Sequence, residues 1–301
     1  MSKFINPFTD VGFKRIFGQE VSKPVLLAFL NSLLEDELHI VDLQYLDKEQ
    51  PGESVDDRSL IYDVYCELDS GEHIIVEMQN RSQPFFKNRS IYYISRSISR
   101  QGEPGPKWHY DVKAVYMISL LNFRREDISH EFRTDVALMD MKHKTLFSDR
   151  MRMVFLQLPY FTKEVDECET VFDKMIYTLK HMDVLQRLPW PAQDAVFQKL
   201  SSIADVASLS KEDRRKYDAN LKAYRDTIAV MEGQYLEGEQ KGIEKGLAKG
   251  RAEGEAKGIE KERKKNDEER RESARKLRDS GVPVALIASS LGLSEKEISE
   301  L

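Results

Sequence analysis

Residues 60–80 read LIYDVYCELDSGEHIIVEMQN, and this stretch decides the fold. Apolar and polar residues alternate on both sides of the turn-forming residues 69–71, which predicts two strands joined as a hairpin. Successive strand residues point to opposite faces, so each strand has an apolar face for the core and a polar face. Asp63 lies on the polar face of the first strand, and Glu77 and Gln79 lie on that of the second.

The length of the turn decides whether the two acids meet. A two-residue loop at residues 70–71 would pair Asp63 with Met78, so that the two acids would not lie opposite each other. A three-residue loop at residues 69–71 pairs Asp63 with Glu77, and this common connection ends on a residue in the left-handed conformation. Gly71 adopts that conformation at no steric cost. We therefore expect Asp63 to lie beside Glu77, with Gln79 next along the strand.

Two neighbouring carboxylates repel each other unless a cation holds them. Hard oxygen ligands at this density suit Mg²⁺, Mn²⁺ or Ca²⁺ better than zinc. The alternative is an amphipathic hairpin whose acidic face is simply solvated, because alternating polarity is normal for half-buried hairpins. The pattern of the hairpin by itself leaves both interpretations open.

Periodicity also predicts the elements around the hairpin. The N-terminal residues Phe13, Ile16 and Phe17 share one helical face. Further helices are expected at residues 24–34, 84–100, 168–188, 191–208 and from 211 onward, and further strands at residues 113–121 and 152–158. Strands among flanking helices, followed by a helical tail, indicate an α/β core.

Other features of the chain accompany the hairpin. They are the N-terminal motif Asp10-x-x-Phe13-Lys14-x-x-Phe17, the strand Val-Glu-Met-Gln-Asn at residues 76–80, and a Gly-rich charged tail. Together with Asp63, they resemble the PD-(D/E)XK nuclease pattern with Gln79 in place of the usual lysine, and they are similar to the Rpn family of recombination-promoting nucleases and transposase-like proteins. The resemblance implies an α/β fold, with a restriction-endonuclease-like mixed sheet core flanked by helices and an α-helical C-terminal extension.

The resemblance also implies a metal-dependent site that cleaves DNA. Asp63 and Glu77 would be metal ligands, and the backbone carbonyl of Met78 would be a third. The implied cofactor is Mg²⁺, or alternatively Mn²⁺ or Ca²⁺. Gln79 stands where the lysine of the pattern would position the attacking water, which makes it a catalytic candidate.

Two residues of the first predicted helix bear on this implied site. Gln79 can orient water but adds no positive charge, so stabilisation of the transition state would rest on the metal or on a nearby cation. Lys14 is one candidate for that cation. Asp10 would supply another metal-binding acid, as helix-borne acids do in relatives of this fold. The alternative role of Asp10 is to cap the helix, which Thr9 would do equally well.

A basic segment follows the hairpin, because no acid occurs between Asn80 and Gln101. The basic side chains of this segment are Arg81, Lys87, Arg89, Arg96 and Arg100. Helical spacing places the last three on one face, with tyrosines interleaved, beside the expected site. We expect them to contact DNA phosphates. The alternative is a solvated helix face whose charges pair with acids elsewhere.

Composition limits the remaining classes of function. The 301-residue chain has a net charge of −6, which argues against a globally basic nucleic-acid binder but not against a local basic site. Cys66 and Cys168 are its only cysteines and neither belongs to a CxxC motif, which excludes a disulfide scaffold and a Cys-based zinc site. With no signal peptide and no apolar run of membrane-spanning length, we expect a cytoplasmic protein that does not bind membranes.

The composition changes near residue 231. Residues 231–280 contain 14 Lys/Arg, 13 Asp/Glu and seven of the 15 glycines, five of which recur every fourth residue from Gly242 to Gly258. This pattern fits a self-associating or spacer helix, or else a flexible charged linker. We predict four parts: a PD-(D/E)XK-like nuclease core at 1–165, a helical annex at 166–230, a Gly-repeat charged helix or linker at 231–271, and a small helix-turn-helix-like module at 272–301.

These observations predict a divalent-metal-dependent DNA endonuclease that hydrolyses phosphodiester bonds. Its partners would be DNA and further copies of the chain, bound through the C-terminal helix. The resemblance adds a link to recombination, mobile elements or phage defence. The alternative is a catalytically weak or inactive member that binds DNA or self-assembles. The intact acid pair and the basic helix favour the enzyme, whereas Gln79 and the acidic net charge favour the alternative.

Overall fold

The computed structural model describes residues 2–50, 60–105, 107–190 and 194–301. They form two compact units, Met1–Ile228 and Ala229–Leu301. The division of the chain into four parts stays a prediction.

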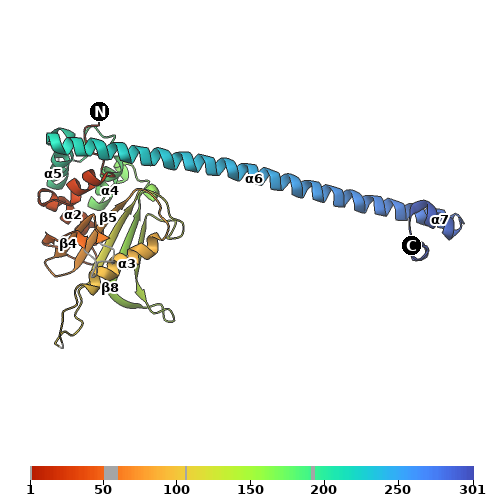
Figure 1. Ribbon diagram of the computed structural model, residues 1–301, viewed down its shortest axis with the longest axis horizontal. Coiled ribbons are helices and arrows are strands. Elements are labelled where there is room, and N and C mark those ends of the chain that lie inside the picture. Colours follow the sequence, from red (N-terminus) through yellow and green to blue (C-terminus); the bar gives the residue numbers. More distant parts are fainter. Residues whose placement is uncertain (1, 51–59, 106, 191–193) are drawn as a thin grey trace. The chain divides into compact units, whose positions relative to one another are not determined.

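A six-stranded mixed sheet lies at the centre of the first unit (Figure 1). Its strands are, in spatial order, β1 (Leu43–Tyr45), β4 (Val64–Leu68), β5 (His73–Gln79), β6 (Val115–Leu121), β8 (Leu146–Gln157) and β7 (Arg133–Met139). The middle strands β5, β6 and β8 run parallel, and the outer pairings are antiparallel. A separate two-stranded sheet joins β2 (Glu49–Gln50) to β3 (Leu60–Ile61). The mixed sheet and its helices confirm the predicted α/β fold.

Helices cover both faces of the sheet. On one face, a single hydrophobic core joins the sheet to α1 (Asp10–Phe17), α2 (Lys23–Leu33), α4 (Val171–His181) and α5 (Ala195–Ala204). On the other face, α3 (Phe86–Ser99) packs through Ile94 against Tyr65 and Ile75. Short 3-10 helices lie at Glu20–Ser22, Leu158–Tyr160, Val165–Glu167 and Val206–Ser208. The face that carries the acids of the hairpin therefore lies under α3.

The β4–β5 hairpin has the register expected for a three-residue turn. Val64 pairs with Val76, and Glu67 pairs with His73. Gly71 has a φ of 94°, which is the left-handed conformation that the turn requires. The expected turn and register are both confirmed.

The first strand of the hairpin is interrupted, although the sequence predicts one strand over residues 60–68. The break between β3 and β4 falls at Tyr62 and Asp63. At Asp63, hydrogen bonds to side-chain carboxylates replace the backbone hydrogen bonds that join paired strands. The Met78 N–H donates to Oδ2 of Asp63 at 2.9 Å, and the Asp63 N–H donates to Oε1 of Glu77 at 3.2 Å.

The outer strands β1 and β7 were not predicted, and the strand expected from residue 152 begins earlier, at Leu146. Most residues in β7 and in the first half of β8 are half-buried or exposed. Such strands lack the continuous apolar run that predicts a buried strand such as β6.

The second unit contains the C-terminal part of α6 (Lys211–Asp279), followed by α7 (Val284–Leu291) and α8 (Glu295–Ser299). Ala274, Ile287 and Ile298 form its small buried core. The glycines from 242 to 258 lie within α6, and a Cβ added at any of them would meet only neighbouring parts of the helix itself within 4 Å. Among the described residues, no helix is long and apolar enough to cross a membrane.

Candidate active site

The two carboxylates of the hairpin lie together near the C-terminal end of β5. Glu77 is only 4% exposed, and Asp63 is half-buried. Each carboxylate accepts one of the two hydrogen bonds that interrupt the strand, so the side chains are fixed against each other. The alternative of a solvated acidic face is wrong, because α3 packs over this face and buries Glu77.

Gln79 and the main chain of Met78 adjoin the pair. The Gln79 Nε2 donates a hydrogen bond of 3.2 Å to Oε2 of Glu77. The Gln79 carbonyl accepts from the N–H of Asn122, which follows β6, so the Gln79 main chain faces β6. Because main-chain groups of successive strand residues face opposite sides, the Met78 carbonyl faces the side on which its N–H meets Asp63. The structure thus brings together the four hairpin residues predicted for the site.

Burial and mutual repulsion disfavour the state in which the carboxyl groups of Asp63 and Glu77 are both ionised. Burial, followed by the charge of Asp63, raises the pKa of Glu77 to about 8. Burial also raises the pKa of Asp63, an effect that the hydrogen bond from Met78 and the positive charge of Lys14 oppose. A cation bound between the carboxylates would remove this penalty.

The two candidates from the first helix form an ion pair with each other. Lys14 contacts Asp10 one turn away on α1, and the Asp10 side chain is 54% exposed. Thr9, rather than Asp10, caps the helix by accepting a hydrogen bond of 3.0 Å from the N–H of Gly12. As a metal ligand, Asp10 stays a prediction.

The start of α1 nevertheless lies close to the acid pair. The Asn80 side chain, directly after β5, donates to the carbonyl of Phe8 at 2.5 Å. The charges of Lys14 and Asp10 act on the pKa of Asp63 in opposite directions. The N-terminal motif therefore borders the site.

Arg89 is a second source of positive charge near the acid pair, and it comes from α3 rather than from α1. It is half-buried on α3, and its guanidinium carbon lies 5.6 Å from the ring centroid of Tyr93. Its Nη1 donates to Oε1 of Gln83 at 2.6 Å. The charge of Arg89 lowers the pKa of both Asp63 and Glu77, which places this cation within electrostatic reach of the pair.

Residues 7–234 match a family model described as a PD-(D/E)XK nuclease family transposase. The chain belongs to this family. The matched range contains every residue of the site, and it ends within α6. Searches of curated proteins and of solved structures found no match.

The other basic residues of this PD-(D/E)XK family member do not gather at the acid pair. Arg81 is exposed in the connection between β5 and α3. Lys87 pairs with Asp127 at 3.2 Å, so for this residue the structure shows the alternative, a charge matched by an acid elsewhere. Arg96 is half-buried and Arg100 is exposed, about two and three helical turns beyond Arg89.

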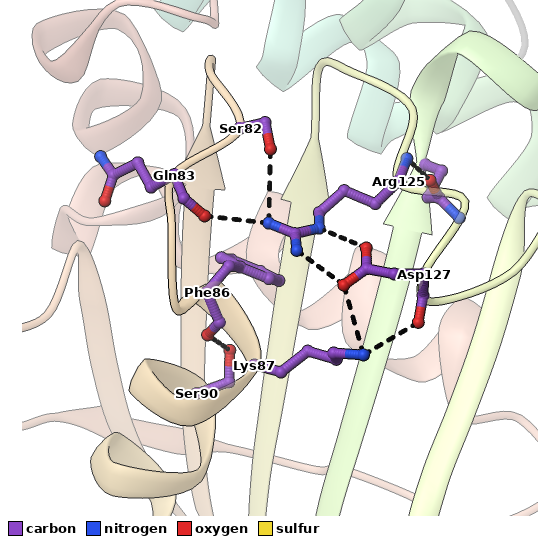
Figure 2. A network of polar contacts seen from close by, with 8 residues as sticks. Ser82, Gln83, Phe86, Lys87, Ser90, Arg125 and Asp127 are labelled. Atoms are coloured by element: carbon purple, nitrogen blue, oxygen red, sulfur yellow. Dashed lines mark hydrogen bonds and ion pairs between the residues drawn. The ribbon is translucent and has the colours of Figure 1, made fainter.

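A polar network holds the β5–α3 connection in place (Figure 2). Arg125, from the segment after β6, donates to the carbonyl of Gln83 at 2.9 Å and to Oγ of Ser82 at 3.3 Å. The same guanidinium pairs with Asp127, and this ion pair lowers the pKa of that carboxyl far below its usual range. Asp127 also holds Lys87 at the start of α3. The network therefore sets where α3 begins.

The residues of the site fit a hard divalent cation. The donors are two carboxylates and a main-chain carbonyl, and the described residues contain no larger group of His, Cys, Asp or Glu that could hold a metal. Ser119 pairs with Glu77 across the parallel β5–β6 ladder, so the two side chains share a face. The Ser119 Oγ is fully buried and has no hydrogen-bond partner among the described residues. A buried hydroxyl without a protein partner beside a buried carboxylate is a group that an ion or a water molecule would satisfy.

Ser119 was not predicted for the site, and the available signal was a serine in the otherwise buried apolar run 115–121. Arg89 was expected beside the site, and its contact with DNA phosphates stays a prediction. Its action on both carboxylates depends on how α3 packs across the sheet.

Proposed function

We propose that this chain is a divalent-metal-dependent DNA endonuclease that hydrolyses phosphodiester bonds. One observation carries the proposal. In a member of a nuclease family, a buried glutamate, Glu77, is fixed against Asp63 beside the main chain of Met78. This donor set suits Mg²⁺, with Mn²⁺ and Ca²⁺ as alternative occupants.

The residues around the cation take complementary roles in the proposal. A bound divalent cation would polarise the scissile phosphate and lower the pKa of the attacking water. The Gln79 Nε2 donates its hydrogen bond to Glu77, so the Gln79 Oε1 is available to accept a hydrogen bond from that water and orient it. Arg89 supplies the positive charge that lysine supplies in the usual pattern, because it acts on both carboxylates.

Cleavage of supercoiled plasmid tests the proposal. We expect nicked or linear product with Mg²⁺ or Mn²⁺ and none with EDTA. Glu67→Ala is the matched control, because Glu67 is a half-buried acid of the same hairpin that lies outside the pair. Absence of cleavage with every metal, by a protein that still binds DNA, would support the alternative of a catalytically inactive DNA-binding member, which Gln79 favours.

The biological setting and assembly are further proposals. The family description names a transposase, which supports a role in recombination or mobile elements. The link to phage defence rests on the resemblance to the Rpn family, and plaque counts on cells carrying the wild type or Asp63→Ala would test it. We also propose that copies of the chain associate through α6, whose glycine stripe is open to a second helix.

A further inference from the structure

Phe85 is an exposed aromatic residue held in an unusual conformation next to the site. Its side chain is 79% exposed, whereas that of the adjacent Phe86 is 2% exposed. Its φ of 61° and ψ of 21° are left-handed, which is rare for a bulky residue. Such conformations persist only where the surrounding structure enforces them, and they concentrate at functional sites.

The segments before and after Phe85 are both held in place, and Figure 2 shows the polar contacts of Gln83 and Lys87 on either side of it. Before Phe85, the main chain of Gln83 is held by Arg125, and its side chain is held by Arg89. After Phe85, Phe86 packs against Phe155 with ring centroids 5.7 Å apart. The ring of Phe85 is thus presented to solvent by a connection that is fixed at both ends.

The surroundings of Phe85 suit nucleic acid better than protein. Lys87 and Asn88, which follow it on the first turn of α3, are exposed and polar, so the ring stands beside a positive charge and an amide. Arg81 and Arg124, at the ends of β5 and β6, are also exposed. Because parallel strands end at the same edge of the sheet, both arginines lie on the side of the site.

We propose that Phe85 is a stacking platform for an unpaired DNA base beside the Asp63–Glu77 pair. The inference rests on the proposed nuclease function for its choice of DNA, and it names the substrate class as single-stranded or locally unpaired DNA. An exposed ring stacks on the face of any base, and an intact duplex offers no free base face. Arg81 and Arg124 would contact the phosphates of the same strand.

The test is fluorescence anisotropy of the full-length chain in EDTA, with a labelled 20-nucleotide single strand of mixed sequence and with its duplex. We expect Phe85→Gly to weaken single-strand binding about tenfold, within the range for one lost base stack, and Phe85→Trp to stay within about twofold of the wild type. Duplex binding should change less than about twofold. Phe147→Ala is the matched control, because Phe147 is 78% exposed on β8, far along that strand from the site.

Stability separates this role from a structural one. Glycine adopts a left-handed conformation without strain, so Phe85→Gly should keep or raise the Tm while binding falls. Equal single-strand affinity for Phe85→Gly and Phe147→Ala would overturn the proposal, as would an equal loss on duplex. Because EDTA excludes metal-dependent cleavage, a chain that stacks bases but never cuts would disprove only the nuclease function.

Discussion

The β4–β5 hairpin and helix α3 bring opposite charges to one site by different routes. Asp63 and Glu77 are 14 residues apart in the chain, and a three-residue turn brings them together. The charge of Arg89 acts on them because α3 packs on this face of the sheet, where Asp127, paired with Arg125, also holds Lys87 in the first turn of the helix. The acids thus depend on local geometry, whereas the neighbouring cation depends on tertiary packing. Substituting the acids of the hairpin and Arg89 of α3 separately tests whether cleavage needs both.

The largest effect is expected from the hairpin. Asp63→Ala removes a proposed metal ligand, and cleavage should fall at least about a thousandfold, which corresponds to about 4 kcal/mol. The variant should stay folded, because the largest hydrophobic core lies on the opposite face of the sheet and Asp63 is only half-buried. Plasmid cleavage with Mg²⁺ and a thermal melt measure the two properties, with Glu67→Ala as the control. Wild-type cleavage by folded Asp63→Ala would remove this residue from the site.

The next largest effect on the cleavage rate is expected from substitutions of Gln79, which stands where the family pattern has a positively charged lysine. Gln79→Ala should cost about 2–4 kcal/mol of transition-state stabilisation, as other lost active-site hydrogen bonds do, whereas Gln79→Lys should keep or raise the rate. Single-turnover cleavage rates at a fixed Mg²⁺ concentration measure the order. Three equal rates would reject any role for Gln79.

The same assay connects the hairpin to α3. Arg89→Ala should slow cleavage about tenfold to a hundredfold, and Arg89→Lys should retain most of the rate because the charge remains. Gln79→Lys combined with Arg89→Ala should recover much of the lost rate, because lysine would return the cation to the site. If the two changes act independently, with the Arg89→Ala loss undiminished by Gln79→Lys, then Arg89 does not replace the lysine of the family pattern.

The raised pKa of Glu77 predicts a pH dependence of stability. Its value of about 8 in the folded chain lies above the ordinary 4.5, so between these pH values the metal-free folded state binds more protons than the unfolded state. The free energy of unfolding should therefore decrease as pH rises from about 5 to 8. Thermal melts in EDTA should show wild type losing stability relative to Glu77→Gln over this range.

Metal should reverse this trend. Mg²⁺ competes with the proton for the carboxylates, so the rise in Tm on adding Mg²⁺ should be larger at pH 8 than at pH 6. Glu77→Gln should lose most of the rise. An equal rise in both proteins would place the bound metal elsewhere.

The smallest effect on cleavage is expected from α6. Deleting residues 233–270 should lower the oligomeric mass in light scattering while the melt of the first unit is retained. Replacing the five glycines from 242 to 258 by alanine is the matched variant, because it favours the helix but fills the stripe. An equal number of copies per particle for all three proteins would favour a spacer that makes no contact between copies.

Much of the first unit follows from patterns that can be read locally. The alternation of polarity in residues 60–80 and Gly71 in the turn were enough to predict the pairing of Asp63 with Glu77. The outer strands β1 and β7 were missed because their exposed side chains carry no core pattern. Whether the polar face of the hairpin is solvated stayed open for a related reason, because nothing in the hairpin shows that a distant helix covers it.

By itself, the sequence determined the hairpin, its register and the residue types at the site, because turn geometry and period-2 alternation act over a few residues. Only the tertiary structure decided that Glu77 is buried, that Ser119 lies beside it, and that the charge of Arg89 on α3 acts on both acids, whereas that of the ion-paired Lys14 acts on Asp63. The pKa of Glu77 depends on its burial and on the charges of Asp63 and Arg89, since desolvation and charge are set by atoms that are near in space and far apart in the chain.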